Sequence, residues 1–123
     1  MTFRIMALVM TCVGCLLGLR WIFAGRSVLK EWGIEATAGL LVLSRRIGAF
    51  DLVLALMFFL GRGAAPSDFR SAVCLVAGGA MALFACLGLF EFLARQVSAG
   101  IFASVVAEVV LAAGFVWVWW GGR

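Results

Sequence analysis

Histidine and tyrosine are absent from this chain, proline occurs once, and charged residues make up only 13% of its 123 residues. Without histidine the chain lacks the most frequent general base and the usual axial ligand of haem b. No nucleophile and base can be recognised as a pair among the remaining residues. We therefore expect no enzymatic activity of its own and no cofactor.

Apolar residues are abundant instead, because 66% of the chain is hydrophobic and its mean hydropathy is +1.19. One membrane-spanning helix needs about 20 apolar residues, so 123 residues with short connections accommodate four crossings and leave no room for a soluble catalytic module. We predict an all-α, integral membrane four-helix bundle that forms one domain over residues 1–123. The predicted helices cover residues 3–23, 45–61, 69–93 and 99–120.

The first apolar segment has the outline of a signal peptide, with Arg4 ahead of a long apolar run. This run is longer than a typical signal core, and no small-x-small cleavage pattern precedes Arg20. We therefore expect the segment to be kept as a helix. The polar stretch that follows, residues 24–37, repeats Val28, Leu29 and Trp32 at helical spacing. Both a short helix in the headgroup region and an ordinary loop fit this pattern.

The second apolar segment is interrupted by two adjacent arginines, Arg45 and Arg46. A helix that begins near Arg45 keeps both at the membrane surface and places Asp51 ~9 Å deeper. A helix that begins near Ala36 would bring all three charges close to the middle of the membrane. The first arrangement costs less, because arginine side chains can then reach water. We therefore predict that this helix begins at residue 45.

Several charges fall toward one face of the membrane once the four segments are drawn. Ionisable groups at bilayer depth are costly, so such a cluster is the natural candidate for function. Glu91 and Arg95 are spaced as a helical pair, whereas Glu108 has no partner on its own segment and must meet an arginine from another helix or take up a proton. The candidate site consists of Arg20, Arg45, Arg46, Asp51, Glu91, Arg95 and Glu108.

This cluster has two interpretations. It forms a self-neutralised network that fixes the helix register, or it forms a one-sided polar pocket around Glu108, with Asp51 as the second buried acid. Surplus arginine in such a pocket would favour an anionic headgroup, a carboxylate-bearing ligand or a quinone carbonyl. Proton-coupled transport through Glu108 or Asp51 is a further possibility.

Small residues recur at helical spacing. Gly14 and Gly18 form a G-x-x-x-G pattern, and Ser44, Gly48 and Ala55 share a stripe with Asp51. Such faces allow close helix packing in membranes, so we expect Asp51 to face the bundle. The four cysteines have no histidine beside them and no compact ligand spacing, which predicts small buried side chains and no metal site.

Basic residues are more numerous on the side of the 24–37 connection, which favours a cytoplasmic position for that side. Most of these residues belong to the charged cluster, however, so the orientation stays open. The positive charge lies along membrane boundaries and is not gathered on a solvent face. We therefore expect no nucleic-acid binding, although the isoelectric point is about 9.4.

The layout resembles a known group of membrane proteins. Trp32 and Gly33 lie in the interfacial stretch, the run Arg45-Arg46-Ile47-Gly48-Ala49-Phe50-Asp51 enters the second helix, and Ala107-Glu108-Val109-Val110-Leu111-Ala112 lies in the fourth. From about Leu16 to Trp120 this pattern is similar to the DoxX-like small four-helix membrane proteins, in particular to a related family of unknown function. The resemblance implies a bacterial inner-membrane location, with Glu108 and the arginine near Ile47 as recurring polar positions.

Two functions from different classes follow. The first is a non-enzymatic accessory or scaffold subunit that binds membrane lipids and other integral membrane subunits or a second copy of itself. The second is a protein that binds or transports a lipid, a quinone or another small molecule through the pocket around Glu108.

Overall fold

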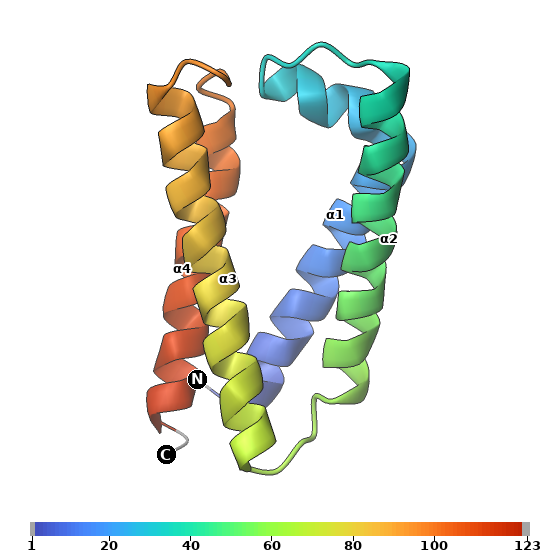
Figure 1. Cartoon of the computed structure of the whole chain (residues 1–123). Helices are drawn as coiled ribbons and strands as arrows, with labels where there is room; N and C mark the ends of the chain where they lie inside the picture. Colours follow the sequence, from blue (N-terminus) through green and yellow to red (C-terminus); the bar gives the residue numbers. More distant parts are fainter. Residues whose placement is uncertain (1, 122–123) are drawn as a thin grey trace. The chain divides into compact units, whose positions relative to one another are not determined.

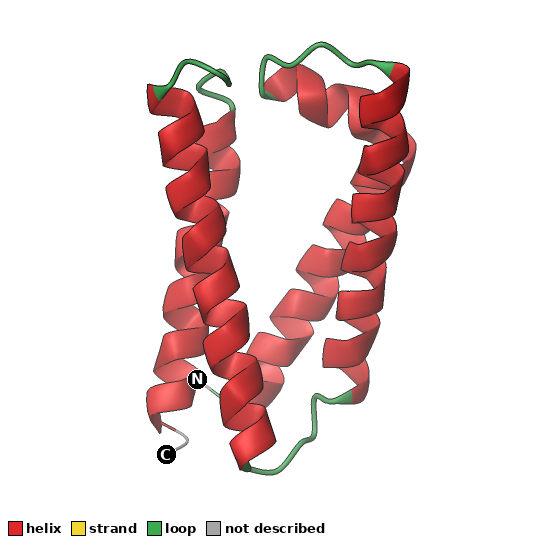
Figure 2. Cartoon of the chain, in the orientation of Figure 1, coloured by secondary structure: helices red, strands yellow, loops and turns green. Residues whose placement is uncertain are grey.

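A computed structural model describes residues 2–121, and within them it contains four α-helices and no β-strand (Figure 2). The helices are α1 (Phe3–Glu31), α2 (Ala38–Leu60), α3 (Asp68–Leu93) and α4 (Ile101–Gly121), as labelled in Figure 1. The all-α prediction is confirmed. Within the described residues α1, α3 and α4 are long and apolar enough to cross a membrane. Helix α2 has 23 residues but carries Arg45, Arg46 and Asp51.

The described residues group into two compact units, and the single domain over residues 1–123 stays a prediction. One unit is Ala7–Arg62, which contains most of α1 and all of α2. The other comprises residues 2–6 and 63–121, with α3 and α4.

Helix α1 extends eight residues beyond its predicted end and bends at Ala24, where the backbone leaves helical values (φ −132°, ψ 33°). It stops in a Schellman motif, in which the Ile34 N–H donates to the Leu29 carbonyl at 2.8 Å and the Gly33 N–H to the Lys30 carbonyl at 3.0 Å. Gly33 supplies the positive φ of 73° that this motif requires. The stretch 24–37 is therefore helical up to Glu31, as a continuation of α1, and residues 32–37 form the turn and loop before α2.

The segment after the bend uses its apolar face within its own unit. Val28 and Leu29 are each 5% exposed and pack with Trp21. The rings of Trp21 and Trp32 meet edge to face, with centroids 5.4 Å apart. The partly buried residues around this cluster are Trp32, Ile34, Ala36, Leu40 and Leu41. The amphipathic pattern that suggested an interfacial helix thus buries its apolar side against the start of α2.

Helix α2 begins at Ala38, so the predicted start at residue 45 is wrong. The Thr37 side chain caps the helix, accepting a hydrogen bond from the Leu40 N–H at 3.2 Å. Apolar residues continue the helix from there to Arg45, and arginine is itself a good helix former. The membrane cost of Arg45 and Arg46 therefore does not determine where α2 begins. Arg45 lies about 10 Å from the start of the helix.

Helices α1 and α2 run antiparallel, packed through small residues (Figure 1). A Cβ placed on Gly14 would lie 2.9 Å from the Ala55 Cβ, and one on Gly18 would lie 2.8 Å from the Gly48 carbonyl oxygen. Farther along, a Cβ on Gly25 would lie 2.5 Å from the Ser44 hydroxyl oxygen. The glycine pattern in the first helix therefore serves close packing, as predicted.

Helices α3 and α4 form a second antiparallel pair. Ser67 caps α3 by accepting from the Arg70 N–H at 3.1 Å, after the turn that contains Pro66. A Cβ on Gly78 would lie 3.3 Å from the Phe115 Cβ, and one on Gly88 would lie 2.7 Å from Val105 Cγ2. The bounds of both helices agree with the prediction to within two residues.

Candidate functional site

The seven predicted site residues are divided between the two units. Four of them, Arg20, Arg45, Arg46 and Asp51, belong to Ala7–Arg62, and three, Glu91, Arg95 and Glu108, belong to the unit of α3 and α4. The structure therefore brings together two smaller groups, and each has its own geometry.

Arg20 forms the one ion pair found within the described residues, and its partner is Glu31. The bend at Ala24 makes this contact possible, because it turns the last part of α1 back toward Arg20. Both side chains are partly exposed, Arg20 at 38% and Glu31 at 49%. Glu31 is not among the predicted site residues, since eleven residues of straight helix would separate positions 20 and 31 by about 16 Å.

Arg45 and Arg46 are exposed, and neither takes part in an ion pair within residues 2–121. Asp51 is half-buried on the stripe of α2 that faces α1, and its carbonyl oxygen would lie 3.0 Å from a Cβ on Gly14. The expected inward position of this stripe is therefore observed, with Asp51 close to the α1 backbone.

Ser44 is the polar side chain that the α1–α2 contact buries, with 2% of its surface exposed. Its hydroxyl group shares its hydrogen bond between the Leu41 carbonyl of the same helix at 2.8 Å and the Trp21 carbonyl of α1 at 3.2 Å. The Ser44 side chain is uncharged, and its contact with the Trp21 carbonyl joins the two helices.

We expect Ser44→Ala to lower the free energy of unfolding by about 1 kcal/mol, because it removes a hydrogen bond between helices but keeps the small contact with Gly25. Unfolding of the purified protein by sodium dodecyl sulfate in mixed micelles, followed by circular dichroism, measures this loss. Ser27→Ala is the control, since Ser27 is exposed on α1. Equal losses in the two variants would contradict the role given to Ser44.

The predicted pair of Glu91 and Arg95 is not formed. Helix α3 ends at Leu93, and Arg95 has a positive φ of 61°, so the two residues no longer share a helical face. The backbone closes the helix instead, with the Gln96 N–H donating to the Glu91 carbonyl at 2.9 Å. Within the described part of the chain, neither side chain has an ion-pair partner.

Glu108 lies on the side of α4 that packs on α3. Gly78 meets Phe115 and Gly88 meets Val105, so the antiparallel register places Glu108 level with Ala85, a small residue that is 5% exposed. The Ser104 hydroxyl, one turn earlier on α4, donates to Glu108 Oε1. Glu91 on α3 is near enough to act on Glu108 electrostatically.

The second carboxyl oxygen of Glu108 sets this residue apart. Oε2 is buried, and within residues 2–121 it has no hydrogen-bond partner. Native proteins satisfy nearly all buried polar atoms, so an exception calls for an explanation. The arginine partner that the network interpretation requires is not found among the described contacts of Glu108.

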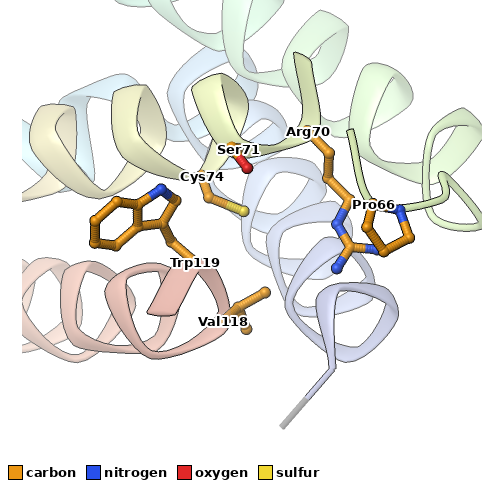
Figure 3. A pocket seen from close by; sticks show the side chains of 6 residues that line it. All are labelled: Pro66, Arg70, Ser71, Cys74, Val118 and Trp119. Carbon is orange, nitrogen blue, oxygen red and sulfur yellow. The ribbon is translucent and has the colours of Figure 1, made fainter. Parts of the chain in front are cut away.

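A small hollow lies elsewhere in this unit, between the start of α3 and the end of α4 (Figure 3). Figure 3 shows Arg70, Ser71 and Cys74 on the α3 side and Trp119 and Val118 on the α4 side. The Arg70 guanidinium donates to the Ala64 carbonyl at 3.0 Å and lies over the Phe3 ring, 5.0 Å from its centroid.

The hollow does not include the predicted pocket residue. Cys74 is separated from the level of Glu108 at Ala85 by about 16 Å along α3. The hollow is not predictable from the sequence, because its residues come from the turn and from two helix ends that no motif connects.

The cysteines differ from their prediction in part. Cys74 is a buried small side chain, 2% exposed, but Cys12 and Cys86 are exposed, and all four thiols are free. Within residues 2–121 no three histidine, cysteine, aspartate or glutamate side chains lie together as a metal site would require.

Comparison of the chain with known protein families, with characterised proteins and with solved structures found no match.

Proposed function

We propose that this protein is a membrane-embedded accessory or scaffold subunit without catalytic activity of its own. The observation that carries the proposal is that the inner and outer faces of its helices carry different kinds of side chain. Small residues form the contact between the helices of each pair. Large apolar side chains point outward instead, such as Phe23 at 81% and Phe69 at 77% exposure. An outer surface of this kind suits lipid and the helices of another membrane subunit or a second copy.

Extraction in a mild detergent tests the accessory role. We expect the tagged chain to co-purify with one membrane protein in a fixed ratio, and the same ratio to persist after cross-linking in intact membranes. Recovery of the chain as a free protein from both preparations would contradict the proposal.

A second candidate function is small-molecule binding at Glu108, and the unpartnered Oε2 atom favours it. A ligand with a hydrogen-bond donor would satisfy this oxygen, while Ser104 keeps the other oxygen occupied. Glu108 would then orient the ligand between α3 and α4.

The substitution Glu108→Gln separates binding from structure, because it keeps the shape of the side chain and removes its charge. We expect the variant to fold and to bind decylubiquinol, a hydroxyl-bearing probe, about tenfold more weakly than the wild type. Microscale thermophoresis in detergent measures the affinity, and circular dichroism the fold.

Asp68→Asn is the matched control, because Asp68 is an exposed acid of the same unit at the start of α3 and is not a predicted site residue. An equal loss of binding in both variants would contradict a specific role for Glu108. Loss of the folded protein in Glu108→Gln alone would favour the structural network.

We further propose a relationship to the DoxX-like proteins and a location in the bacterial inner membrane. Both rest on the arrangement of four helices, three of them apolar enough to cross a membrane, with Glu108 in the last. Expression of the tagged chain in a bacterium, followed by separation of inner and outer membranes, tests the location.

A further inference from the structure

One end of the α1–α2 unit carries a surplus of positive charge. We call this end, around the bend of α1 and the first turns of α2, the basic end. Its five basic side chains outnumber its two acidic ones, and one of the acids, Glu31, is paired with Arg20. The ionisable residues of the basic end are Arg20, Arg26, Lys30, Glu31, Glu35, Arg45 and Arg46.

Two tryptophans of α1 and of the turn after it lie next to the part of α2 that carries Arg45 and Arg46. The hydroxyl group of Ser44, the residue before Arg45, lies 3.2 Å from the Trp21 carbonyl oxygen. Trp21 is stacked edge to face with Trp32. Tryptophan rings gather where the hydrocarbon meets the headgroups, which supports a position of the two arginines near that boundary.

Both arginines are exposed, and Arg46 lies on the side of α2 that is opposite to α1. Ser44 faces α1, and a residue two positions later lies roughly 200° around the helix, so Arg46 occupies the outer side of α2. Phe50, Val53 and Met57 continue the stripe of Arg46 at spacings of four, three and four residues, and they are 65%, 63% and 45% exposed. Two exposed arginines thus lie at one end of a row of exposed apolar side chains, which we call the apolar track.

From this arrangement we propose that Arg45 and Arg46 bind the phosphodiester headgroup of an anionic phospholipid, whose acyl chain lies along Phe50, Val53 and Met57. The charges are complementary, since neither arginine has an acidic partner within the described residues. Planar guanidinium groups bind phosphate oxygens in a bidentate way. The apolar track fits a lipid chain and distinguishes the lipid from free phosphate.

Native mass spectrometry of the purified protein with phosphatidylglycerol or phosphatidylcholine tests the site. We expect phosphatidylglycerol to bind the wild type at least tenfold more tightly than phosphatidylcholine. Arg45→Gln/Arg46→Gln should abolish this preference, whereas Arg45→Lys/Arg46→Lys should keep part of it. Inorganic phosphate at millimolar concentration should not displace the lipid.

The control is Arg4→Gln/Arg62→Gln, which removes the same charge elsewhere. Arg4 is exposed near the N-terminus, and Arg62 donates to the Phe59 carbonyl at the far end of α2. This variant should retain the preference. Equal binding of both lipids by the wild type, displacement by phosphate, or an equal loss in the control would overturn the proposal. The wild-type comparison decides the matter even if the double glutamine variant fails to fold.

Discussion

Gly48→Ala is expected to lower the free energy of unfolding by about 3 kcal/mol, through overpacking between α1 and α2. A Cβ at this position would lie 2.5 Å from the Gly18 carbonyl oxygen and 2.6 Å from Ile22 Cγ1. The side chain of Ile22 has some freedom to move, but the Gly18 carbonyl is part of the α1 backbone. The two helices must therefore separate locally, and contacts on both sides of Gly48 weaken.

Titration with sodium dodecyl sulfate in mixed micelles, followed by circular dichroism, gives the loss. Gly39→Ala is the matched control, because it makes the same substitution in the same helix. A Cβ on Gly39 would lie more than 4 Å from every atom outside the neighbouring residues and the backbone of its own helix. This variant should leave stability unchanged or raise it slightly, since alanine is the better helix former. Similar behaviour of the two variants would show that α1 and α2 are not packed through Gly48.

The variant Phe115→Ala should cost about 3 kcal/mol as well, by the opposite mechanism. Phe115 is completely buried and packs where α3 has Gly78. Van der Waals packing is the main force between helices in a membrane, and alanine would leave a void that the glycine cannot fill.

Phe90→Ala provides the comparison, since it removes the same ring from a position on α3 that is 63% exposed. Its effect on unfolding should be below about 1 kcal/mol. A cost for Phe90→Ala as large as that for Phe115→Ala would contradict the described contact between α3 and α4.

The sequence predicts well what depends on apolar length and turn composition. Helices α3 and α4 are predicted nearly in full, because both are long apolar segments and a polar turn with Pro66 precedes α3. The sequence also identified the glycine pattern of α1, since Gly14 and Gly18 have the spacing of a packing face.

Features that depend on competing local energies were harder to predict. Two effects compete at the start of α2: the membrane cost of two arginines favours a start at residue 45, and the cap at Thr37 favours a start at Ala38. The helix begins at Ala38. The bend at Ala24 involves no proline, so the local sequence does not predict it. The pairing of Arg20 with Glu31 depends on this bend and is therefore not predicted either. The end of α3 at Leu93 likewise removes the spacing on which the predicted pair of Glu91 and Arg95 relied.

The candidate site illustrates the same limit. Glu108 could be singled out from sequence as an acid in an apolar helix without a partner nearby. Its hydrogen bond to Ser104 follows from a spacing of four residues, but the isolation of Oε2 depends on how α3 covers it. That property belongs to the packed pair of helices and not to either helix alone.

The glycine contacts also bear on the order of assembly. Those between α1 and α2 and those between α3 and α4 join helices that are consecutive in the chain, so each pair closes across one short connection. Closing a short connection costs little chain entropy and is fast. The residues that join α1 to α2 are all synthesised before α3, so the first pair can assemble in the membrane during synthesis. Gly48→Ala should accordingly make the nascent chain sensitive to proteolysis at an early stage of translation.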